Sequence, residues 1–291
     1  MITQRTQTVI RCVGGAAITI LCIGCAQIFN FDKEYLIRNE SSGGGGAGGD
    51  ASGGGAGGDA SGGGAGGGGA GGGPVELDCD VNEIPPGVDL HLSLIDDLED
   101  GNNRIKYIER RHGYWVVFND GTGVKQEPTN SARLVSAIDP PRPGSNGEIS
   151  KKALHTSGEG FTTWGAGVST DLNDTFYDAS EYRGITFWAR ADGDSFTDLN
   201  VDFVDRQTVW DGGICVQEPT EPRTGCNDHF HTSVTLDSRW RYFHVTASCL
   251  VQQGFGMQFD GVKMDELKTL HFTVFGPQAF SIWIDDISFY R

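Results

Sequence analysis

The alternation of apolar and polar side chains is clearest in residues 226–248, CNDHFHTSVTLDSRWRYFHVTAS. Apolar residues alternate with polar ones in both halves of this segment, which is the pattern of a half-buried β-strand. An Asp-Ser pair typical of turns separates the halves. The segment therefore predicts a β-hairpin whose outward face carries His229, His231, Tyr242 and His244.

Similar short apolar segments recur along the chain, separated by clusters of Gly, Asn, Asp and Pro. Besides the hairpin they cover residues 105–108, 114–119, 153–156, 162–169, 184–191, 199–204, 269–275 and 281–290. No segment has a helical period over a dozen residues. Short strands between turn clusters predict an all-β fold, an antiparallel β-sandwich or barrel.

Alternation also assigns the outward side chains of two further predicted strands. Trp188 and Arg190 point outward if Phe187 points into the core, and Asn200 and Asp202 do so in the next strand. With the hairpin, one non-core face then presents eight candidate ligand-binding residues: Trp188, Arg190, Asn200, Asp202, His229, His231, Tyr242 and His244. Aromatic rings stack on sugar C–H groups, and the polar side chains bind hydroxyls. The alternative is that Trp188 and Trp240 are core residues.

The charge of the chain excludes one class of partner. Its 291 residues carry a formal net charge of −17. Nucleic-acid binding requires a cluster of basic residues that displaces counterions from phosphates, and the sequence has none. We therefore expect no nucleic acid among the partners, and neutral ligands or cations rather than polyanions.

Residues 1–24 have the features of an export signal, with arginines ahead of an apolar run. That run is shorter than the roughly 20 residues that span a bilayer. The sequence LCIGC at residues 21–25 resembles the lipobox of bacterial lipoproteins, which implies that Cys25 receives a lipid. Cys22 departs from that pattern, and a plain secretory signal is the alternative. We expect an exported protein held in the bacterial envelope by a lipid anchor, at the outer membrane or cell surface.

A tether follows the signal. Residues 25–74 are polar and then almost entirely Gly, Ala, Asp and Ser, a composition that buries too little apolar surface to fold. Residues 75–291 remain for one folded domain, a length common for a single β-sandwich. We expect this domain to be a monomer displayed on a disordered leash.

Four cysteines belong to the predicted domain: Cys79, Cys215, Cys226 and Cys249. An even number in an exported chain fits two disulfides, for which three connectivities exist. Cys215 and Cys226 flank one polar loop, so we expect them to pair. Cys79 is then left to pair with Cys249.

Four motifs point to a known family. They are IDDLEDG at residues 95–101, WGAG at 164–167, GITFWAR at 184–190 and WIDDI at 283–287. Together they resemble the β-jelly-roll carbohydrate-binding modules, most closely the family 11 modules and the related complex I intermediate-associated, galactose-binding-like domains. The resemblance covers residues 94–290. It implies a two-sheet jelly roll whose first and last strands are neighbours, often with a structural calcium ion where they meet.

The calcium ion implied by this resemblance would be bound by Glu99 with Asp285 or Asp286. Calcium takes six to eight oxygen ligands, mostly carboxylates and carbonyls. Two acidic clusters brought together by strand pairing would also repel each other without a cation. The alternative is that these acids cap turns and face water.

We therefore predict a surface protein whose jelly-roll head binds a glycan or polysaccharide without catalysis. The H-x-H pair of His229 and His231, completed by His244 or Asp228, leaves a zinc or copper site as an alternative. The sequence shows neither a G-x-S-x-G nucleophile motif nor an evident pair of glycosidase carboxyls. A jelly-roll glycoside hydrolase, a polysaccharide lyase and a protein-interaction module are the remaining alternatives.

Overall fold

The computed structural model describes residues 79, 83–84, 90–123, 125–144, 148–193 and 197–291. The predicted export signal at residues 1–24, the lipid-bearing Cys25 and the tether at 25–74 lie outside the described residues. They stay predictions, as does the start of the domain at residue 75. Within the described ranges, no helix is long and apolar enough to cross a membrane.

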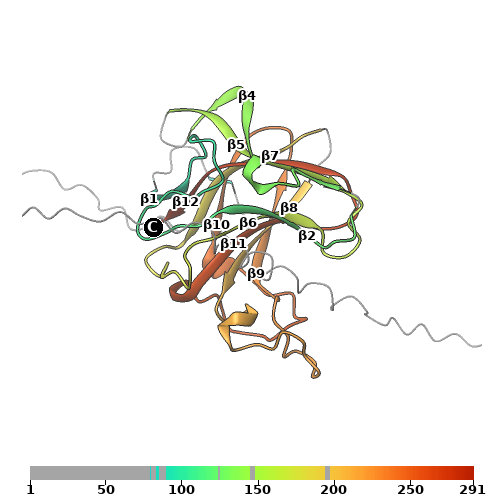
Figure 1. The fold of residues 1–291 in the computed structure, drawn as a ribbon. Helices are drawn as coiled ribbons and strands as arrows, with labels where there is room; N and C mark the ends of the chain where they lie inside the picture. The colour runs from blue at the N-terminus through green and yellow to red at the C-terminus, as the bar shows by residue number, and fades with distance from the viewer. Residues whose placement is uncertain (1–78, 80–82, 85–89, 124, 145–147, 194–196) are drawn as a thin grey trace, which may run out of the picture.

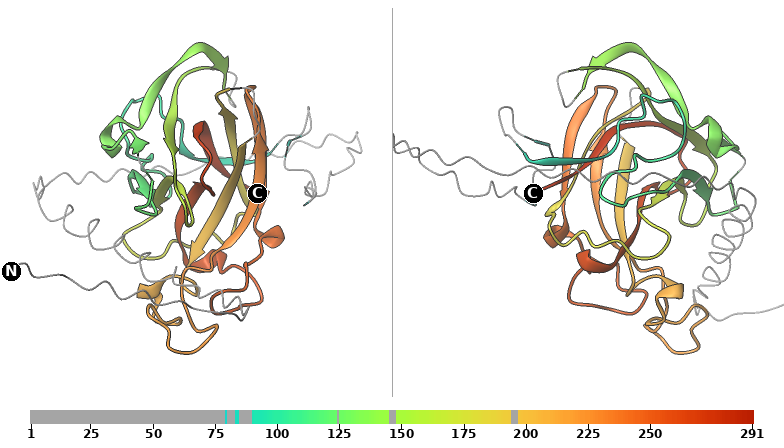
Figure 2. Two further views of the ribbon diagram at one scale, coloured as in Figure 1. Left: turned by 90° about the vertical axis from the view of Figure 1, so that its right-hand side faces the viewer. Right: turned by 60° about the vertical axis from the view of Figure 1, so that its left-hand side comes forward.

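The described residues form two antiparallel β-sheets packed face to face (Figures 1 and 2). The seven-stranded sheet has the order β10-β7-β12-β5-β3, with β1 also paired to β12 and β4 to β5. Its strands are β1 (Leu92–Asp96), β3 (Lys125–Glu127), β4 (Val135–Pro143), β5 (Ile149–Glu159), β7 (Gly184–Ala191), β10 (Arg241–Thr246) and β12 (Phe280–Tyr290).

The five-stranded sheet has the order β2-β6-β11-β8-β9. Its strands are β2 (Trp115–Asn119), β6 (Ala166–Asp171), β8 (Thr197–Asp205), β9 (Phe230–Leu236) and β11 (Leu267–Val274). Short 3-10 turns lie between strands: η3 (Ser131–Arg133), η4 (Trp210–Gly212), η5 (Ala247–Cys249) and η6 (Met264–Glu266). From β6 to β12 the chain crosses repeatedly between the sheets, which is the jelly-roll arrangement expected from the sequence. The predicted all-β, two-sheet antiparallel sandwich is confirmed.

The core lies between the two sheets and is filled by every second side chain of their strands. Phe187 of β7 meets Phe272 of β11 across the core, with ring centroids 5.1 Å apart. Trp115 is fully buried, and its indole Nε1 donates a 2.9 Å hydrogen bond to Asp96. This bond ties β2 of one sheet to β1 of the other.

The predicted hairpin at residues 226–248 is wrong. Strand β9 pairs with β8 in the five-stranded sheet, and β10 pairs with β7 in the seven-stranded sheet. The link between β9 and β10 crosses the sandwich, as Figure 1 allows the reader to follow. Both strands bury one face against the same core, so the same alternation fits a hairpin and a crossing equally well.

Of the other predicted strands, the one at residues 105–108 is wrong and the one at 162–169 begins too early, since β6 starts at Ala166; the rest are confirmed. Residues 105–108 form no strand in the described structure, where this loop contributes only an isolated bridge between Arg104 and Tyr114. The predictions missed β1, β3 and β4. β3 has only three residues, and three prolines interrupt the alternation in β4, whereas the Leu92 and Leu94 alternation of β1 was overlooked.

The last strand, β12, lies beside β1, as the resemblance implied, and it also pairs with β5 and β7. Its pairing with β7 shifts between Asp285 and Ser288, which is a β-bulge. Asp286 has a positive φ of 47° there. The extra residue shifts the alternation by one position, so that core-facing residues are Ile282 and Ile284 before the bulge and Ile287 and Phe289 after it. Two consecutive aspartates, Asp285 and Asp286, lie at the bulge itself.

Both predicted disulfides are confirmed, Cys79–Cys249 and Cys215–Cys226. Cys249 ends the turn that follows β10. Close to Cys79 in the sequence, Glu83 pairs with Phe243 of β10. The first described residues are therefore fastened to the edge of the seven-stranded sheet.

We expect the two disulfides to differ in their contribution to stability. They close loops with sequence separations of 170 and 11 residues. Loop-closure entropy predicts a loss of roughly 5 kcal/mol when Cys79 and Cys249 are both replaced by Ser, and roughly 3 kcal/mol for Cys215 and Cys226. Guanidinium denaturation of the two double variants measures this. A larger loss from the shorter loop would contradict the entropic explanation.

Candidate functional site

The structure separates the eight predicted ligand-binding residues into two groups on opposite outer surfaces. Asn200, Asp202 and His231 lie on the five-stranded sheet, with His229 directly before β9. The other four lie on the seven-stranded sheet: Trp188, Arg190, Tyr242 and His244. The prediction that one face carries all eight is wrong, because β9 and β10 belong to different sheets.

Two rows of outward side chains cross the five-stranded sheet, and we call them the polar face. The first row consists of Val116, Ser169, His271, Asp202 and His231. The second consists of Phe118, Gly167, Thr273, Asn200 and Ser233. Residues paired directly across neighbouring strands have Cβ atoms about 5 Å apart. From β11 to β9 each row is therefore a continuous line of polar side chains, and on the β2 side the second row ends in Gly167 and the apolar ring of Phe118.

Asp202 lies at the centre of the polar face, between His271 on β11 and His231 on β9. It is 9% exposed, and among the described residues we find one hydrogen bond to its carboxylate, from Thr273 Oγ1 at 3.4 Å. Burial raises the pKa of Asp202 to about 7. Near neutral pH this carboxyl group is therefore present in both its charged and its neutral form.

Two histidines of this surface are held in the neutral form. Burial lowers the pKa of His229 to about 3 and that of His271 well below its usual value. Their rings meet edge to face with centroids 5.5 Å apart, and His229 Nδ1 lies 2.9 Å from Thr208 Oγ1. A neutral imidazole carries one donor and one acceptor, which suits hydroxyl groups.

The zinc or copper alternative receives no geometric support. His244, its predicted third ligand, lies on the opposite sheet. Asp228 directs its carboxylate to the backbone N–H groups of Gln253, Gly254 and Gly256. In the described part of the chain, no group of three or more His, Cys, Asp or Glu residues is arranged to hold a metal ion.

An aromatic cluster borders the polar face on the side of β2. The ring of Phe118 stacks on Trp164 with centroids 5.5 Å apart and lies 5.0 Å from the ring of His271. Sequence reasoning did not select Phe118, His271 or Trp164 as binding residues. The alternation in residues 114–119 and 269–275 does place Phe118 and His271 outward, but only the order of the strands shows that they are neighbours.

Seven planar side chains stack on the outer surface of the seven-stranded sheet, and we call them the stacked ladder. In order they are Tyr242, Trp188, Arg142, Trp240, Arg190, Trp283 and His155. Successive members lie 4.0 to 5.4 Å apart, measured between ring centroids and guanidinium carbons. Trp188 and Trp240 are half-buried and lie outside the core. Because rings within the ladder turn their faces to one another or to a guanidinium group, those faces are unavailable to a sugar.

Aspartates hold the two arginines of the ladder in place. Arg142 Nη2 lies 2.6 Å from Asp285 and 3.1 Å from Asp286, the two residues of the β12 bulge. Arg190 Nη1 lies 2.6 Å from Asp192. Burial raises the pKa of Asp285 to about 7, while the charge of Arg142 acts in the opposite direction.

The structure brings two of the predicted calcium ligands close together. Ser150 Oγ lies 3.3 Å from Glu99 and 2.6 Å from Asp285. Glu99 also accepts backbone hydrogen bonds from Lys151 and Lys152, and the cation beside Asp285 is the guanidinium of Arg142. A calcium ion at Asp285 would have to compete with Arg142. Calcium at Glu99, Asp285 and Asp286 stays a prediction.

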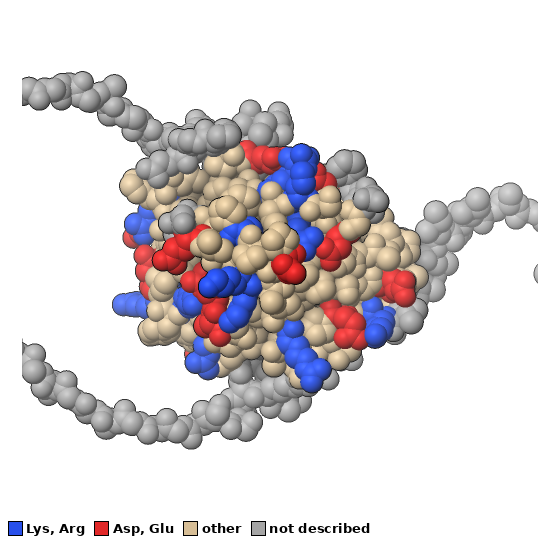
Figure 3. All heavy atoms as spheres, turned by 90° about the horizontal axis from the view of Figure 1, so that it is seen from above, with Lys and Arg blue, Asp and Glu red and all other residues tan. Residues whose placement is uncertain are grey.

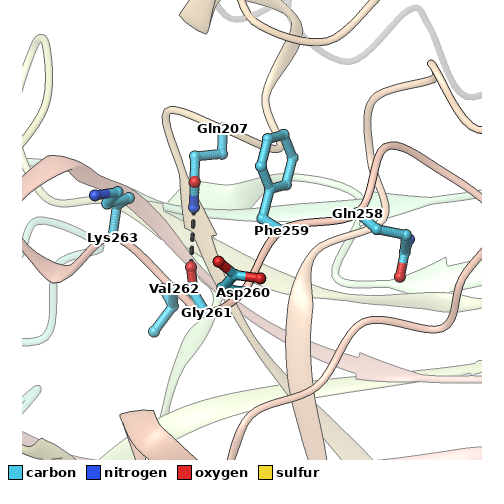
Figure 4. A pocket seen from close by; sticks show the side chains of 7 residues that line it. All are labelled: Gln207, Gln258, Phe259, Asp260, Gly261, Val262 and Lys263. Atoms are coloured by element: carbon cyan, nitrogen blue, oxygen red, sulfur yellow. Dashed lines mark hydrogen bonds between the residues drawn. The ribbon is translucent and has the colours of Figure 1, made fainter.

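A hollow of about 650 Å³ lies beside the end of β8 (Figure 4). It is lined by Gln207 and the loop of residues 258–263, and Gln207 Nε2 donates a 3.0 Å hydrogen bond to the carbonyl of Gly261. Its charged groups are Asp260 and Lys263, both exposed. This lining has no aromatic ladder and no buried acid, so it is a weaker binding site than the polar face.

Basic and acidic side chains lie interspersed on the surface seen from above in Figure 3. The two rows of the polar face contain no Lys or Arg. These rows therefore offer no cation to a polyanion, and the expectation drawn from the net charge of −17 stays a prediction.

No protein-family model and no curated protein matches the chain. Among solved structures, it is similar to a family 11 carbohydrate-binding module from Clostridium thermocellum in complex with a β-1,3-1,4-mixed-linked tetrasaccharide. The identity is 16%, the TM-score 0.41, and the match covers 69% of this chain and 96% of that module. It is also similar to a family 30 carbohydrate-binding module of a cellulosomal cellulase from Clostridium thermocellum. There the identity is 16%, the TM-score 0.36, and the coverage 65% of this chain and 96% of that one. At these identities and scores no functional conclusion follows from the likeness.

Replacing Arg142 by Met removes the counter-charge of two aspartates at the β12 bulge. We expect the free energy of unfolding to fall by about 3 to 5 kcal/mol, as when one partner of a buried ion pair is removed. The matched control is Arg190→Met, whose partner Asp192 is more exposed, so a smaller loss is expected. Thermal unfolding with calcium and with chelator should show the larger calcium effect in Arg142→Met, where Asp285 is released. Equal behaviour of the two variants would contradict the role given to Arg142.

We expect Asp202→Asn to stabilise the protein in a pH-dependent way. The folded-state pKa of about 7 lies above the ordinary value of 3.8, so the folded state binds the proton more tightly than the unfolded state. Asp202 therefore lowers the stability of the wild type as the pH rises from about 4 to about 7, and the Asn variant lacks this contribution. The expected gain is roughly 4 kcal/mol above pH 7 and vanishes near pH 4. Denaturation curves across this range measure it, and a pH-independent difference would contradict the assignment.

Proposed function

We propose that the protein binds a carbohydrate non-catalytically on the polar face of the five-stranded sheet. The observation that carries this proposal is Asp202, a carboxyl group kept almost entirely buried with one long hydrogen bond among the described residues. A buried polar group without good partners costs stability. A hydroxyl-rich ligand would supply the missing hydrogen bonds.

The neighbours of Asp202 fit the same ligand. His271 and His231 flank it in the first row, and Asn200 and Thr273 belong to the second row. These groups both donate and accept hydrogen bonds, as sugar hydroxyls require. Trp164, half-buried and stacked on the buried ring of Phe118, offers apolar surface at one side of the face, where the C–H side of a sugar ring can pack.

The charge of the polar face favours a neutral glycan. Its rows hold one carboxyl group, Asp202, and no cation, and His229 and His271 are neutral at physiological pH. A uronic acid or a sulfated sugar would bring a negative charge beside Asp202 without an arginine or lysine to bind it. Neutral polysaccharides meet no such penalty.

The setting of this activity is part of the proposal. The export signal at residues 1–24 and the lipobox-like sequence ending in Cys25 support an exported protein anchored by lipid in the bacterial envelope. The Gly-rich tether would carry the head away from the membrane surface. We further propose that the head acts as a monomer.

The test is a glycan array and calorimetry with the full chain, using neutral, amino and acidic saccharides. We expect binding of a neutral oligosaccharide without release of products. Asp202→Asn and His271→Ala should each weaken it about tenfold or more, as expected for central contacts of an interface. Both variants should stay folded, and Asp202→Asn should be more stable than the wild type.

Trp188→Ala on the stacked ladder serves as the control, because it lies on the opposite sheet. Its binding should equal that of the wild type. Loss of binding in Trp188→Ala, with Asp202→Asn unaffected, would move the site to the seven-stranded sheet. Release of shortened sugars would favour a hydrolase or lyase, and binding to no glycan would sink the proposal.

A further inference from the structure

The first row of the polar face does not end at the edge strand β9. His231 forms an antiparallel bridge with Val251, with backbone hydrogen bonds of 2.9 and 3.1 Å in the two directions. Residues paired in this way place their side chains on the same side of a sheet. Val251 is therefore the next member of the row after His231, and its side chain is 61% exposed.

The loop that continues from Val251 is fixed by one buried carboxylate. Asp228, which directly precedes His229, is 1% exposed. Its oxygens accept hydrogen bonds of 2.7 to 3.0 Å from the N–H groups of Gln253, Gly254 and Gly256 and from Nε2 of Gln258. The loop of residues 251–258 is thus attached to the strand that carries the polar face.

Two glycines allow the backbone of this loop to reach the carboxylate of Asp228. Gly254 has a φ of +97°, which L-residues rarely adopt. A Cβ atom on Gly256 would lie 2.6 Å from Cβ of Asp228 and 2.7 Å from the carbonyl oxygen of Gly225. Glycine is therefore needed at position 254 for its backbone conformation and at position 256 for the close approach to Asp228.

Phe255 stands between these two glycines, with its neighbours on both sides hydrogen-bonded to Asp228. It is 50% exposed, although a phenylalanine gains free energy from burial. Because Asp228 fixes the backbone on both sides of Phe255, binding through this ring would cost little backbone conformational entropy. Such a ring is suited to contact a ligand.

The geometry points to the loop of residues 251–258 as the second part of the glycan-binding site, with Phe255 as its aromatic contact. This inference rests on the function proposed for the polar face. From Ser169 through His271, Asp202 and His231 to Val251, the row crosses four strand spacings, or about 19 Å. A ligand that reaches the loop is therefore an extended oligosaccharide, longer than a single sugar ring.

The experiment compares affinity for short and long ligands. Calorimetry is run on the full chain with neutral gluco-, manno- and galacto-oligosaccharides, each as disaccharide and hexasaccharide. In the wild type we expect the hexasaccharide of the bound series to bind more tightly. Phe255→Ala should lower hexasaccharide affinity about tenfold and leave disaccharide affinity unchanged.

Phe255→Tyr keeps the ring and should keep the hexasaccharide affinity. Ile149→Ala is the matched control, since Ile149 is 63% exposed on β5 of the opposite sheet. Melting curves check that all three variants stay folded.

The outcomes separate this inference from the proposed function. If Phe255→Ala binds both ligands like the wild type while Asp202→Asn binds neither well, the loop has no part in the site and the proposed function stands. An equal loss for disaccharide and hexasaccharide would mean that Phe255 acts through the fold of the site, which overturns its role as a distal contact. Failure of the wild type to bind any of the sugars overturns both.

Discussion

The pairing of Arg142 with the two aspartates of the β12 bulge is the interaction on which the seven-stranded sheet depends. The bulge lets the last strand keep its apolar side chains in the core on both sides of Asp285 and Asp286. It thereby leaves Asp285 buried, and such a charge is tolerated only with a partner. Arg142 supplies the partner from β4 and is itself held between Trp188 and Trp240. The fold at this point is maintained by charge pairing and ring stacking together.

The two outer surfaces of the sandwich use similar residue types in opposite ways. On the seven-stranded sheet, the rings and guanidinium groups of the ladder satisfy one another, and the acids there have cations within 3.1 Å. On the five-stranded sheet, Asp202 is buried with little compensation, and both the neighbouring His271 and His229, which contacts His271, are held neutral. A surface whose charged and aromatic groups are paired with one another contributes stability. A surface with a poorly hydrogen-bonded buried carboxyl group at its centre lowers the stability of the fold, which is common where a protein binds a ligand.

Much of the sandwich was predictable from local alternation, because each strand buries one face whatever its partner is. The disulfide pairs followed from counting and spacing. The candidate site was only half predictable: alternation places Asp202, His231 and His271 outward, but it does not show that His271 is the neighbour of Asp202. Which strands lie together is decided by non-local pairing, and alternation around Leu236 and Phe243 is the same for a hairpin and for a crossing. The roles of Arg142, His271 and Phe255 depend on residues far away in the sequence, so they could not be predicted from local patterns.

The disulfide between Cys79 and Cys249 determines where a force applied to the N-terminal chain would act on the domain. Tension applied to the chain ahead of Cys79 passes through the sulfur atoms to the end of β10, at the edge of the seven-stranded sheet. The residues between the two cysteines, from β1 through β10, lie inside a covalent loop and are not extended by that tension. In a head tethered from its N-terminal side, Ser169, Asp202 and His231 of the first row would lie inside this protected loop, whereas His271 on β11 lies outside it.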